Sequence, residues 1–267
     1  MKRVSELYNR HPGSDIYIVG TGTSLRVFPL DMLKGRITIG LNMAWKKVDV
    51  LYCITIHPEL NIPEFMPNES PHPEIEWIIK PEKLQNVEES KRHLVADRSY
   101  FFESFARPNT QPSDQPSDSG REAAWVEKPH GDSLYQWSSI SQTAVNLAAN
   151  MGAKNIFLIG CDNSPLLDNH HAHDQHTRWK GVDPNLRYDQ YYEGLAEIRP
   201  FLRKRGINLV SINPFLSLNL PERDYQRLCV ELDQPKHIAS HDVSERVSFK
   251  GRIKNVLQKA NRVIFSK

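Results

Sequence analysis

Six short apolar runs, several of them rich in β-branched residues, constrain the fold of this chain most. Each is too short for a buried helix and is typical of a strand covered on both faces of a parallel sheet. Helical periodicity appears between some of these runs, so the sequence predicts an α/β fold with a Rossmann-like, mostly parallel sheet flanked by helices. The runs occupy residues 16–19, 37–40, 50–56, 77–79, 156–159 and 207–212.

The clearest helical pattern covers residues 139–151. Its apolar residues fall on one face, serines precede it as N-cap groups, and Gly152 ends it. A second helix is expected from about residue 188 to 205, where Pro200 is expected to cause a kink. A short helix is also predicted over residues 28–34.

A glycine-bearing turn, residues 20–24, follows the first apolar run. Leu25 takes the place of the third glycine of the dinucleotide fingerprint, and Asn42 rather than an acidic residue ends the next strand. These differences disfavour an NAD site, and the absence of Gly-Lys-Ser/Thr argues against a P-loop. The turn instead offers backbone N–H groups and the Thr23 and Ser24 hydroxyls to an anion. A tight turn with no ligand is the simpler alternative.

Asn42 can both donate and accept hydrogen bonds, which suits a ribose hydroxyl or a pyrimidine edge. A second turn, Trp137-Ser138-Ser139-Ile140-Ser141, opens the helix that leads into the run at 156–159. Ligands of open α/β sheets bind outside the carboxyl ends of the strands, and both turns are expected at that edge. Asn213 follows the last run and is expected there too, unless it only ends the strand. The pattern predicts a nucleotide-type ligand.

The first turn with Leu25 resembles the Gly-Asn-Gly-Pro-Ser-Leu turn of bacterial family 42 sialyltransferases. It equally resembles the Gly-x-Gly-Pro-Ser-Leu turn of archaeal-type 6-hydroxymethylpterin diphosphokinase-like (MptE-like) proteins. Residues 138–162 run without a gap against a sialyltransferase segment that ends in Leu-Gly-(x)-Lys-x-Ile-x-Leu-x-Gly-x-Asp. The resemblance covers roughly residues 15–60 and 135–215.

The resemblance implies a set of nucleotide-binding residues at these turns and strand ends. Several family side chains differ here: Thr21 replaces an Asn, Ser139-Ile140 replaces a Thr-Ser pair, and Trp137 replaces an Arg. The tyrosine that helps to bind the leaving phosphate has no counterpart at Asn163 or Ser164. The implied nucleotide-binding residues are Gly20, Gly22, Thr23, Ser24, Asn42, Ser139, Ser141, Gly160, Asp162 and Asn213.

A histidine-rich stretch from Asp168 to Lys180 follows this segment. In the sialyltransferases a lid at this place carries the general base, which makes His176 and His173 the candidate catalytic residues. Arg178, Tyr188 and Tyr191 are candidates for stabilising the departing phosphate. Two alternatives stay open: a Zn²⁺ or Mn²⁺ site that includes His170 and His173, and a solvated polar loop.

The resemblance implies a glycosyltransferase-like enzyme that transfers a sialic-acid-type sugar from a donor such as CMP-sialic acid to a glycan or lipid-linked acceptor. This reaction needs no metal or other cofactor. One alternative is a diphosphokinase-like transferase that uses ATP and Mg²⁺, with Asp162 and Asp168 as metal ligands. Another is a catalytically inactive nucleotide-binding domain.

The chain of 267 residues suits one domain with a smaller appendage. We predict a Rossmann-like nucleotide-binding domain over residues 1–220 and a C-terminal extension over 221–267. Residues 106–133 contain four prolines and two copies of Gln-Pro-Ser-Asp, which leaves few apolar groups for a core and predicts a flexible insertion. Residues 163–187 are predicted to form a lid-like loop.

Charge and cysteine content point to a cytoplasmic location. The 34 basic and 32 acidic residues give a net charge of +2, so no nucleic-acid partner is expected. Three scattered cysteines indicate reduced thiols, and neither an apolar signal core nor a membrane-spanning run is present. Residues 249–267 carry six basic and no acidic residues and predict a basic amphipathic helix, either on the inner face of an anionic membrane or packed on the domain. A homo-oligomer is compatible with the sequence.

Overall fold

The computed structural model describes residues 2–26, 28–105, 122–162, 172 and 184–212. Its centre is an eight-stranded sheet in the order β1-β6-β5-β4-β3-β2-β9-β10, in which every neighbouring pair is parallel. The α/β class and the parallel sheet expected from the sequence are therefore confirmed. The strands are β1 (Lys2–Arg3), β2 (Asp15–Val19), β3 (Ile37–Leu41), β4 (Tyr52–Thr55), β5 (Glu76–Ile79), β6 (Ser99–Phe101), β9 (Asn155–Ile159) and β10 (Asn208–Ser211).

Alternate side chains of the central strands fill two separate cores. Ile16 and Ile18 of β2 join the core on one face, whereas Tyr17 and Val19 join the core on the other. This alternation follows from the two-residue period of a strand, and it explains why the runs are apolar throughout. Tyr17 also stacks on Phe157 of β9, with ring centroids 5.0 Å apart.

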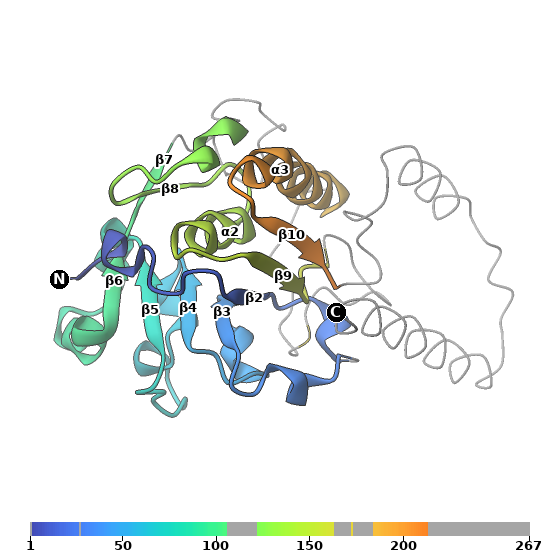
Figure 1. Ribbon diagram of the computed structural model, residues 1–267. Helices are drawn as coiled ribbons and strands as arrows, with labels where there is room; N and C mark the ends of the chain where they lie inside the picture. The colour runs from blue at the N-terminus through green and yellow to red at the C-terminus, as the bar shows by residue number, and fades with distance from the viewer. Residues whose placement is uncertain (1, 27, 106–121, 163–171, 173–183, 213–267) are drawn as a thin grey trace, which may run out of the picture.

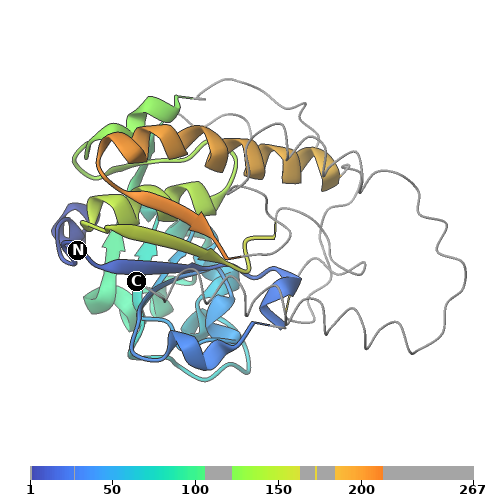
Figure 2. The same ribbon diagram turned by 45° about the vertical axis from the view of Figure 1, so that its right-hand side comes forward.

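Two long helices cover one face of the sheet (Figures 1 and 2). They are α2 (Ile140–Asn150) and α3 (Pro184–Lys204), which pack against each other. The predicted helix at 139–151 is confirmed as α2. The second predicted helix is also present as α3, which begins four residues before the start we expected and contains Pro200.

Short helical turns, rather than long helices, cover the opposite face (Figure 1). Their apolar side chains, such as Leu33, Trp45 and Phe65, reach the second core. The predicted helix at 28–34 is the 3₁₀ turn η3, with Pro29 as its N-cap residue. The turns of this face are η2 (Thr23–Arg26), η3 (Leu30–Leu33), η4 (Ala44–Lys46), α1 (Pro58–Asn61), η5 (Pro63–Phe65), η6 (Pro81–Asn86) and η7 (Glu89–Arg98). Two further turns, η1 (Val4–Leu7) and η8 (Ala123–Glu127), contribute to the core on the α2 and α3 side instead.

The structure describes residues 122–133 of the insertion expected at 106–133. Its last residues include η8 and the first residue of β8 (Ser133–Tyr135), which pairs in parallel with β7 (Glu103–Phe105). Val126 of η8 is fully buried against the α2 and α3 side, and Trp125 stacks between Phe105 and His130. These apolar contacts were not predicted, because prolines and polar residues dominate the composition of the segment. Residues 106–121 lie outside the described residues.

Several other predictions concern residues that the structure does not describe. These are residues 163–183 of the lid-like loop, apart from Ala172, and the whole C-terminal extension with its predicted amphipathic helix. Residues 184–187, which we placed in the loop, belong to α3. Within the described part of the chain, no helix combines the length and apolar character needed to cross a membrane.

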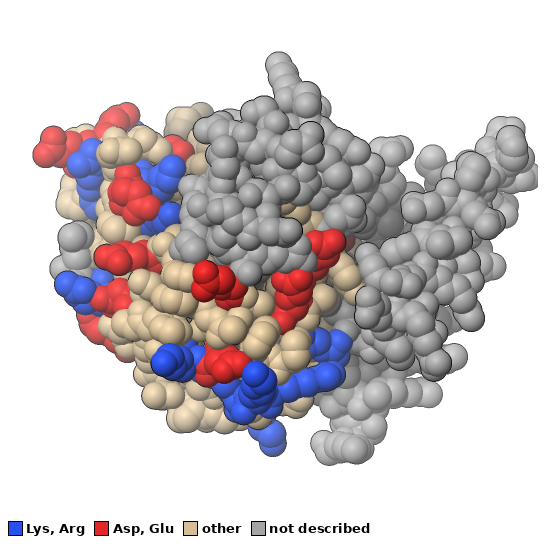
Figure 3. Space-filling view, turned by 90° about the horizontal axis from the view of Figure 1, so that it is seen from above, with Lys and Arg blue, Asp and Glu red and all other residues tan. Residues whose placement is uncertain are grey.

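Acidic and basic side chains are interspersed on the described part of the face seen in Figure 3. Elsewhere on the described surface, Lys204 pairs with Glu127 at 2.6 Å, and Arg3 pairs with the partly buried Asp132 at 2.6 Å. The nearly balanced composition is therefore also balanced locally on this face.

Candidate functional site

The strand order reverses between β2 and β9. From β2 the chain moves through β3, β4 and β5 toward one edge of the sheet, and β9 and β10 then extend the sheet on the other side of β2. In open α/β sheets this switch point leaves a crevice outside the carboxyl ends of the strands, which is where ligands bind. β2 ends in the predicted glycine turn at residues 20–24, and β9 is followed by a second turn, Gly160-Cys161-Asp162, which contains two of the predicted nucleotide-binding residues.

The two turns approach each other closely at their glycines. The Gly20 N–H donates to the Ile159 carbonyl at 2.7 Å, and the Gly22 N–H donates to the Gly160 carbonyl at 2.7 Å. A Cβ atom at Gly20 would lie 2.8 Å from the Gly160 carbonyl carbon, closer than real contacts allow. Gly160 itself has a φ of +63°, in the left-handed region that glycine tolerates best.

Ser24 and Asp162 join the turns through their polar groups. The Ser24 backbone N–H donates to Asp162 Oδ2 at 2.6 Å, and its hydroxyl donates to Asp162 Oδ1. Both residues are buried, as is Thr23. The turn therefore does present donors to an anion, and the anion that Ser24 meets in this structure is the chain's own carboxylate.

Ala172, from the middle of the histidine-rich stretch, packs against the first turn. Its N–H donates to the Thr21 carbonyl at 2.7 Å, and its carbonyl accepts from Arg26 Nε at 3.0 Å. Ala172 is 3 % exposed. The candidate catalytic residues His173 and His176, together with Arg178, lie outside the described residues.

Asn42 directly follows β3, as the glycine turn follows β2. Its φ of 52° is left-handed, and its N–H donates to the Ile54 carbonyl at 3.0 Å. The side-chain oxygen Oδ1 accepts from Thr55 Oγ1 at 3.2 Å. The Thr55 hydroxyl oxygen also accepts from Asn61 Nδ2 at 2.9 Å and from the His57 N–H at 3.0 Å. The strand ends of β3 and β4 are thus tied together by polar side chains.

The second predicted turn forms the N-terminus of α2, which packs over β2, β3 and β4. Ser139 is the N-cap residue and accepts from the Ser141 N–H at 3.2 Å, and the hydroxyls of these two serines contact each other. Gln142 Oε1 accepts from the Ser138 N–H at 3.0 Å and from the Trp137 N–H at 3.3 Å. These bonds fix the turn at the carboxyl edge of the sheet.

The structure places most of the predicted nucleotide-binding residues along one edge. The glycine turn, Asn42, the α2 N-terminus and residues 160–162 all lie at the carboxyl ends of the strands or above them. Tyr191 lies in α3 and is partly buried, Tyr188 is described only as part of the α3 backbone, and Asn213 lies outside the described residues.

Sequence reasoning missed the polar residues that follow β4 and β5. His57 and Glu59 come directly after β4, and their side chains lie 3.5 Å apart from Nδ1 to Oε1. Lys80 follows β5, is 5 % exposed, and its Nζ lies 3.0 Å from Glu82 Oε1. The sequence did contain a signal for them, since His57 and Lys80 are the first charged or titratable residues after the apolar runs at 50–56 and 77–79.

No group of three or more histidine, cysteine or acidic residues that would suit a metal ion occurs among the described residues. Asp162, a Mg²⁺ ligand in the diphosphokinase-like alternative, has both carboxylate oxygens bonded to Ser24. A Mg²⁺ ion bound by Asp162 would have to share these oxygens with the Ser24 donors. Asp168 and His170 lie outside the described residues.

Two of the three cysteines lie near the site as buried free thiols. Cys53 Sγ donates to the Asn42 carbonyl at 3.2 Å, and burial raises the pKa of the Cys53 thiol. Burial, with a contribution from Asp162, raises the pKa of Cys161 to about 12. Both therefore stay protonated at neutral pH, which is typical of structural rather than reactive cysteines.

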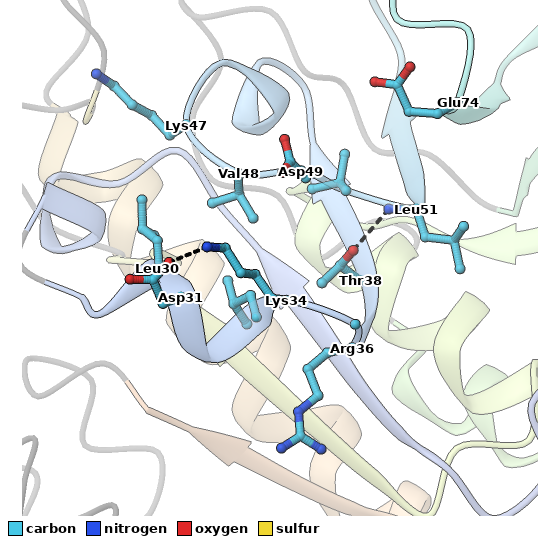
Figure 4. A pocket seen from close by; sticks show the side chains of 13 residues that line it. Leu30, Asp31, Lys34, Arg36, Thr38, Lys47, Val48, Asp49, Leu51 and Glu74 are labelled. Carbon is cyan, nitrogen blue, oxygen red and sulfur yellow. Dashed lines mark hydrogen bonds and ion pairs between the residues drawn. The ribbon is translucent and has the colours of Figure 1, made fainter.

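A cavity of about 420 Å³ lies at the opposite edge of the sheet, where β3, β4 and β5 begin (Figure 4). Apolar groups of Leu30 and Val48 line it, and Lys34 pairs with Asp31 across one side at 2.7 Å. The longer charged side chains at its rim, such as Arg36 and Lys47, point away from one another in Figure 4. This cavity shares no residue with the carboxyl edge.

The carboxyl edge between β2 and β9 thus combines glycines that permit close backbone approach, a buried serine–aspartate contact, a left-handed asparagine and a capped helix N-terminus. Compared with protein-family models, curated proteins and solved structures, the chain matches none.

Proposed function

We propose that this chain is a Rossmann-like, glycosyltransferase-like enzyme that transfers a sialic-acid-type sugar from a nucleotide-activated donor to a glycan or lipid-linked acceptor. The observation that supports the proposal best is the contact at the switch point between the glycine turn after β2 and the Gly160-Cys161-Asp162 turn after β9. Ser24 and Asp162 stand 138 positions apart in the sequence, and each belongs to a segment that resembles the sialyltransferases. CMP-sialic acid is the donor that this resemblance favours.

Each part of the edge has a role in the proposal. The α2 N-terminus attracts the donor's phosphate, because its helix dipole and hydroxyls favour an anion. Asn42 contacts the donor through its amide, and Gly20 and Gly22 let the ligand approach the backbone. Arg178, Tyr188 and Tyr191 stabilise the departing phosphate.

The transfer step needs one proton acceptor. The acceptor hydroxyl attacks the anomeric carbon, a new carbon–oxygen bond forms, and the bond to the phosphate oxygen breaks with its electron pair. The hydroxyl proton passes to His176 or His173. The anchoring of Ala172 on Thr21 supports this role, because Ala172 directly precedes His173 in the sequence and is fixed at the switch point.

The diphosphokinase-like alternative requires ATP and Mg²⁺ at the same edge. A Mg²⁺ ion there would share the Asp162 oxygens with the Ser24 donors. The metal-independent reaction is our leading proposal because residues 138–162 resemble the sialyltransferase segment without a gap. An inactive nucleotide-binding domain would show the same ligand binding without turnover.

Binding and turnover measurements separate these functions. We expect CMP to bind without Mg²⁺ in calorimetry, and we expect CMP-sialic acid to release CMP in the presence of the enzyme. ATP binding that depends on Mg²⁺, with no affinity for CMP or CDP, would support the diphosphokinase-like function instead. CMP binding with no turnover across a panel of glycan acceptors would support the inactive domain.

Matched variants test the assigned residues. Asn42→Gly removes the side-chain amide, and glycine tolerates the left-handed backbone at this position. CMP affinity should therefore fall about tenfold. Asn68 has the same left-handed conformation, with a φ of 64°, and Asn68→Gly serves as its control. His176→Ala or His173→Ala should lower kcat by about 10²- to 10⁴-fold. Full activity in both histidine variants would rule out the proposed base.

We also propose that the protein is cytoplasmic and peripheral at the inner face of the cell membrane, through the basic helix predicted at residues 249–267. The physical basis is the attraction of six basic groups on an amphipathic helix to anionic lipid. Sedimentation with vesicles that contain phosphatidylserine should separate the full chain from a variant lacking residues 249–267. Equal sedimentation of the two would overturn the proposal.

A further inference from the structure

His57 and Glu59 form an imidazole–carboxylate pair at the carboxyl edge of the sheet. They lie immediately after β4, and β4 is the direct neighbour of β3, which ends at Asn42. His57 Nδ1 lies 3.5 Å from Glu59 Oε1. The His57 side chain is 49 % exposed and the Glu59 side chain 23 %, so the histidine is the member of the pair that solvent and ligands can reach.

Glu59 has an unusual environment for a carboxylate. Its second oxygen, Oε2, is buried and has no hydrogen-bond partner among the described residues. A buried carboxylate oxygen without a donor is costly, and a neighbouring hydrogen-bond donor or positive charge reduces this cost. The other oxygen of Glu59, Oε1, faces Nδ1 of His57, so a protonated Nδ1 places an N–H and partial positive charge beside this carboxylate. A proton held at Nδ1 leaves Nε2 as the atom that exchanges a proton with a ligand.

The backbone on both sides of the His57 side chain is fixed to the network around Asn42. The His57 N–H donates to Thr55 Oγ1 at 3.0 Å, and the His57 carbonyl accepts from Asn61 Nδ2 at 3.0 Å. The Thr55 hydroxyl in turn donates to Asn42 Oδ1. The backbone of His57 is thus bonded to the same group of side chains as the predicted nucleotide-contacting asparagine.

We propose that His57, oriented by Glu59, hydrogen-bonds the phosphate of the donor and gives it a proton as it leaves. This inference rests on the proposed sugar transfer. In this role His57 replaces the tyrosine that holds the leaving phosphate in the sialyltransferases, because that tyrosine has no counterpart at Asn163 or Ser164.

The step balances without a further reactant. The acceptor oxygen forms a bond to the anomeric carbon, and the carbon–oxygen bond to the phosphate breaks with its electron pair on the phosphate oxygen. That oxygen takes the Nε2 proton of the imidazolium form of His57, which keeps its Nδ1 proton, while the hydroxyl proton of the acceptor passes to the separate base. Because its side chain is half exposed, His57 regains its proton from water. Glu59 touches no reacting atom and acts as a positioning residue.

Steady-state kinetics of the full chain with CMP-N-acetylneuraminic acid provide the first test. His57→Gln keeps a hydrogen-bonding side chain and removes the transferable proton, so kcat should fall about 10²-fold or more, with the donor KM changed less than threefold. Glu59→Gln should lower kcat about tenfold, and Glu59→Asp should restore part of that loss. His93→Gln, at an exposed position of η7, should keep full activity and is the matched control. Wild-type kcat in His57→Gln would overturn the inference.

Nuclear magnetic resonance of the wild-type imidazoles tests the contact itself and does not depend on whether a variant folds. Titration with CMP should shift the ring ¹⁵N and ¹H signals of His57 and leave those of His93 in place. CMP binding that leaves the His57 signals unchanged would overturn the inference while the proposed function stands. If CMP does not bind at all, the proposed function fails, and the role of His57 fails with it.

Discussion

Ser24 donates both its backbone N–H and its hydroxyl to the carboxylate of Asp162, which closes the two turns at the switch point on each other. This close contact requires glycine at position 22, because a Cβ atom there would lie 2.6 Å from both Asp162 Oδ2 and the Gly160 carbonyl oxygen. The carboxylate holds the turn in shape before any ligand arrives. This arrangement pre-organises the ligand-facing backbone, and it makes the site part of the stable core.

Asp162→Ala should therefore destabilise the fold as well as the site. A buried hydrogen bond to a charged group contributes roughly 1.5–3 kcal/mol, so we expect the free energy of unfolding to fall by about 3 kcal/mol. Ser24→Ala should cost less, because it removes only the hydroxyl. The double variant should lose less than the sum of the two. Asp31→Ala, which breaks an exposed pair with Lys34, is the control and should change stability little in urea denaturation.

Gly20→Ala should lower stability and ligand affinity more than the addition of one methyl group usually does. The new Cβ atom would meet the backbone of Gly160 and Cys161, and backbone cannot rotate away as a flexible side chain can. We expect stability to fall by about 1–3 kcal/mol and CMP binding to weaken with it. Gly35→Asn is the control, because position 35 has open space and asparagine tolerates its left-handed φ. A Gly20→Ala variant as stable as the wild type would show that the turns are not packed as described.

The central sheet was predictable because its strands are buried on both faces. Runs such as 156–159 are apolar at every position, and all six runs became strands of the parallel sheet. β1 and β6 were not predicted, since Lys2–Arg3 carries no apolar signal and Ser99–Phe101 is only three residues long. Periodicity identified α2 and α3, whereas the short turns of the opposite face are too brief to show a period.

The site was predictable only where a known pattern exists. The glycine turns, Asn42 and the α2 N-terminus match such a pattern, and the structure places them along one edge. The partnership of Ser24 with Asp162 was not foreseen, since a sequence does not reveal which donors are already satisfied inside the protein. His57 and Glu59 were missed because their proximity to Asn42 arises from strand order, which the sequence does not state.

Acid should weaken the contact between the N-terminal segment and the β7–β8 unit. Burial alone would raise the pKa of Asp132, but hydrogen bonds from Ser5 and the ion pair with Arg3 outweigh it and hold that pKa below its ordinary value of 3.8. A depressed carboxyl pKa gives stability that is present above pH 3.8 and is lost as the pH falls through the lower, folded-state value.

Urea midpoints of wild type and Asp132→Asn, measured from pH 6 down to about pH 2.5, check this dependence. The wild type should be the more stable protein above pH 3.8, and the difference should shrink as the solution becomes more acidic. Asn keeps the shape of the side chain, so the comparison isolates the charge. A difference that stays constant over the whole range would mean that the charge of Asp132 has no part in stability.

Gly194 of α3 and Gln142 of α2 should show strong energetic coupling. A Cβ atom at position 194 would lie 2.7 Å from Gln142 Cδ and would overlap its amide nitrogen. Gly194→Ala therefore pushes Gln142 away from the N–H groups of Trp137 and Ser138, and it should cost about 2 kcal/mol although alanine favours helices. Gln142→Ala alone leaves those N–H groups without their acceptor and should cost about 1–3 kcal/mol. The double variant should lose clearly less than the sum, because the smaller side chain at 142 makes room for the new methyl group. Additive losses in urea denaturation would show that α2 and α3 do not meet at this pair.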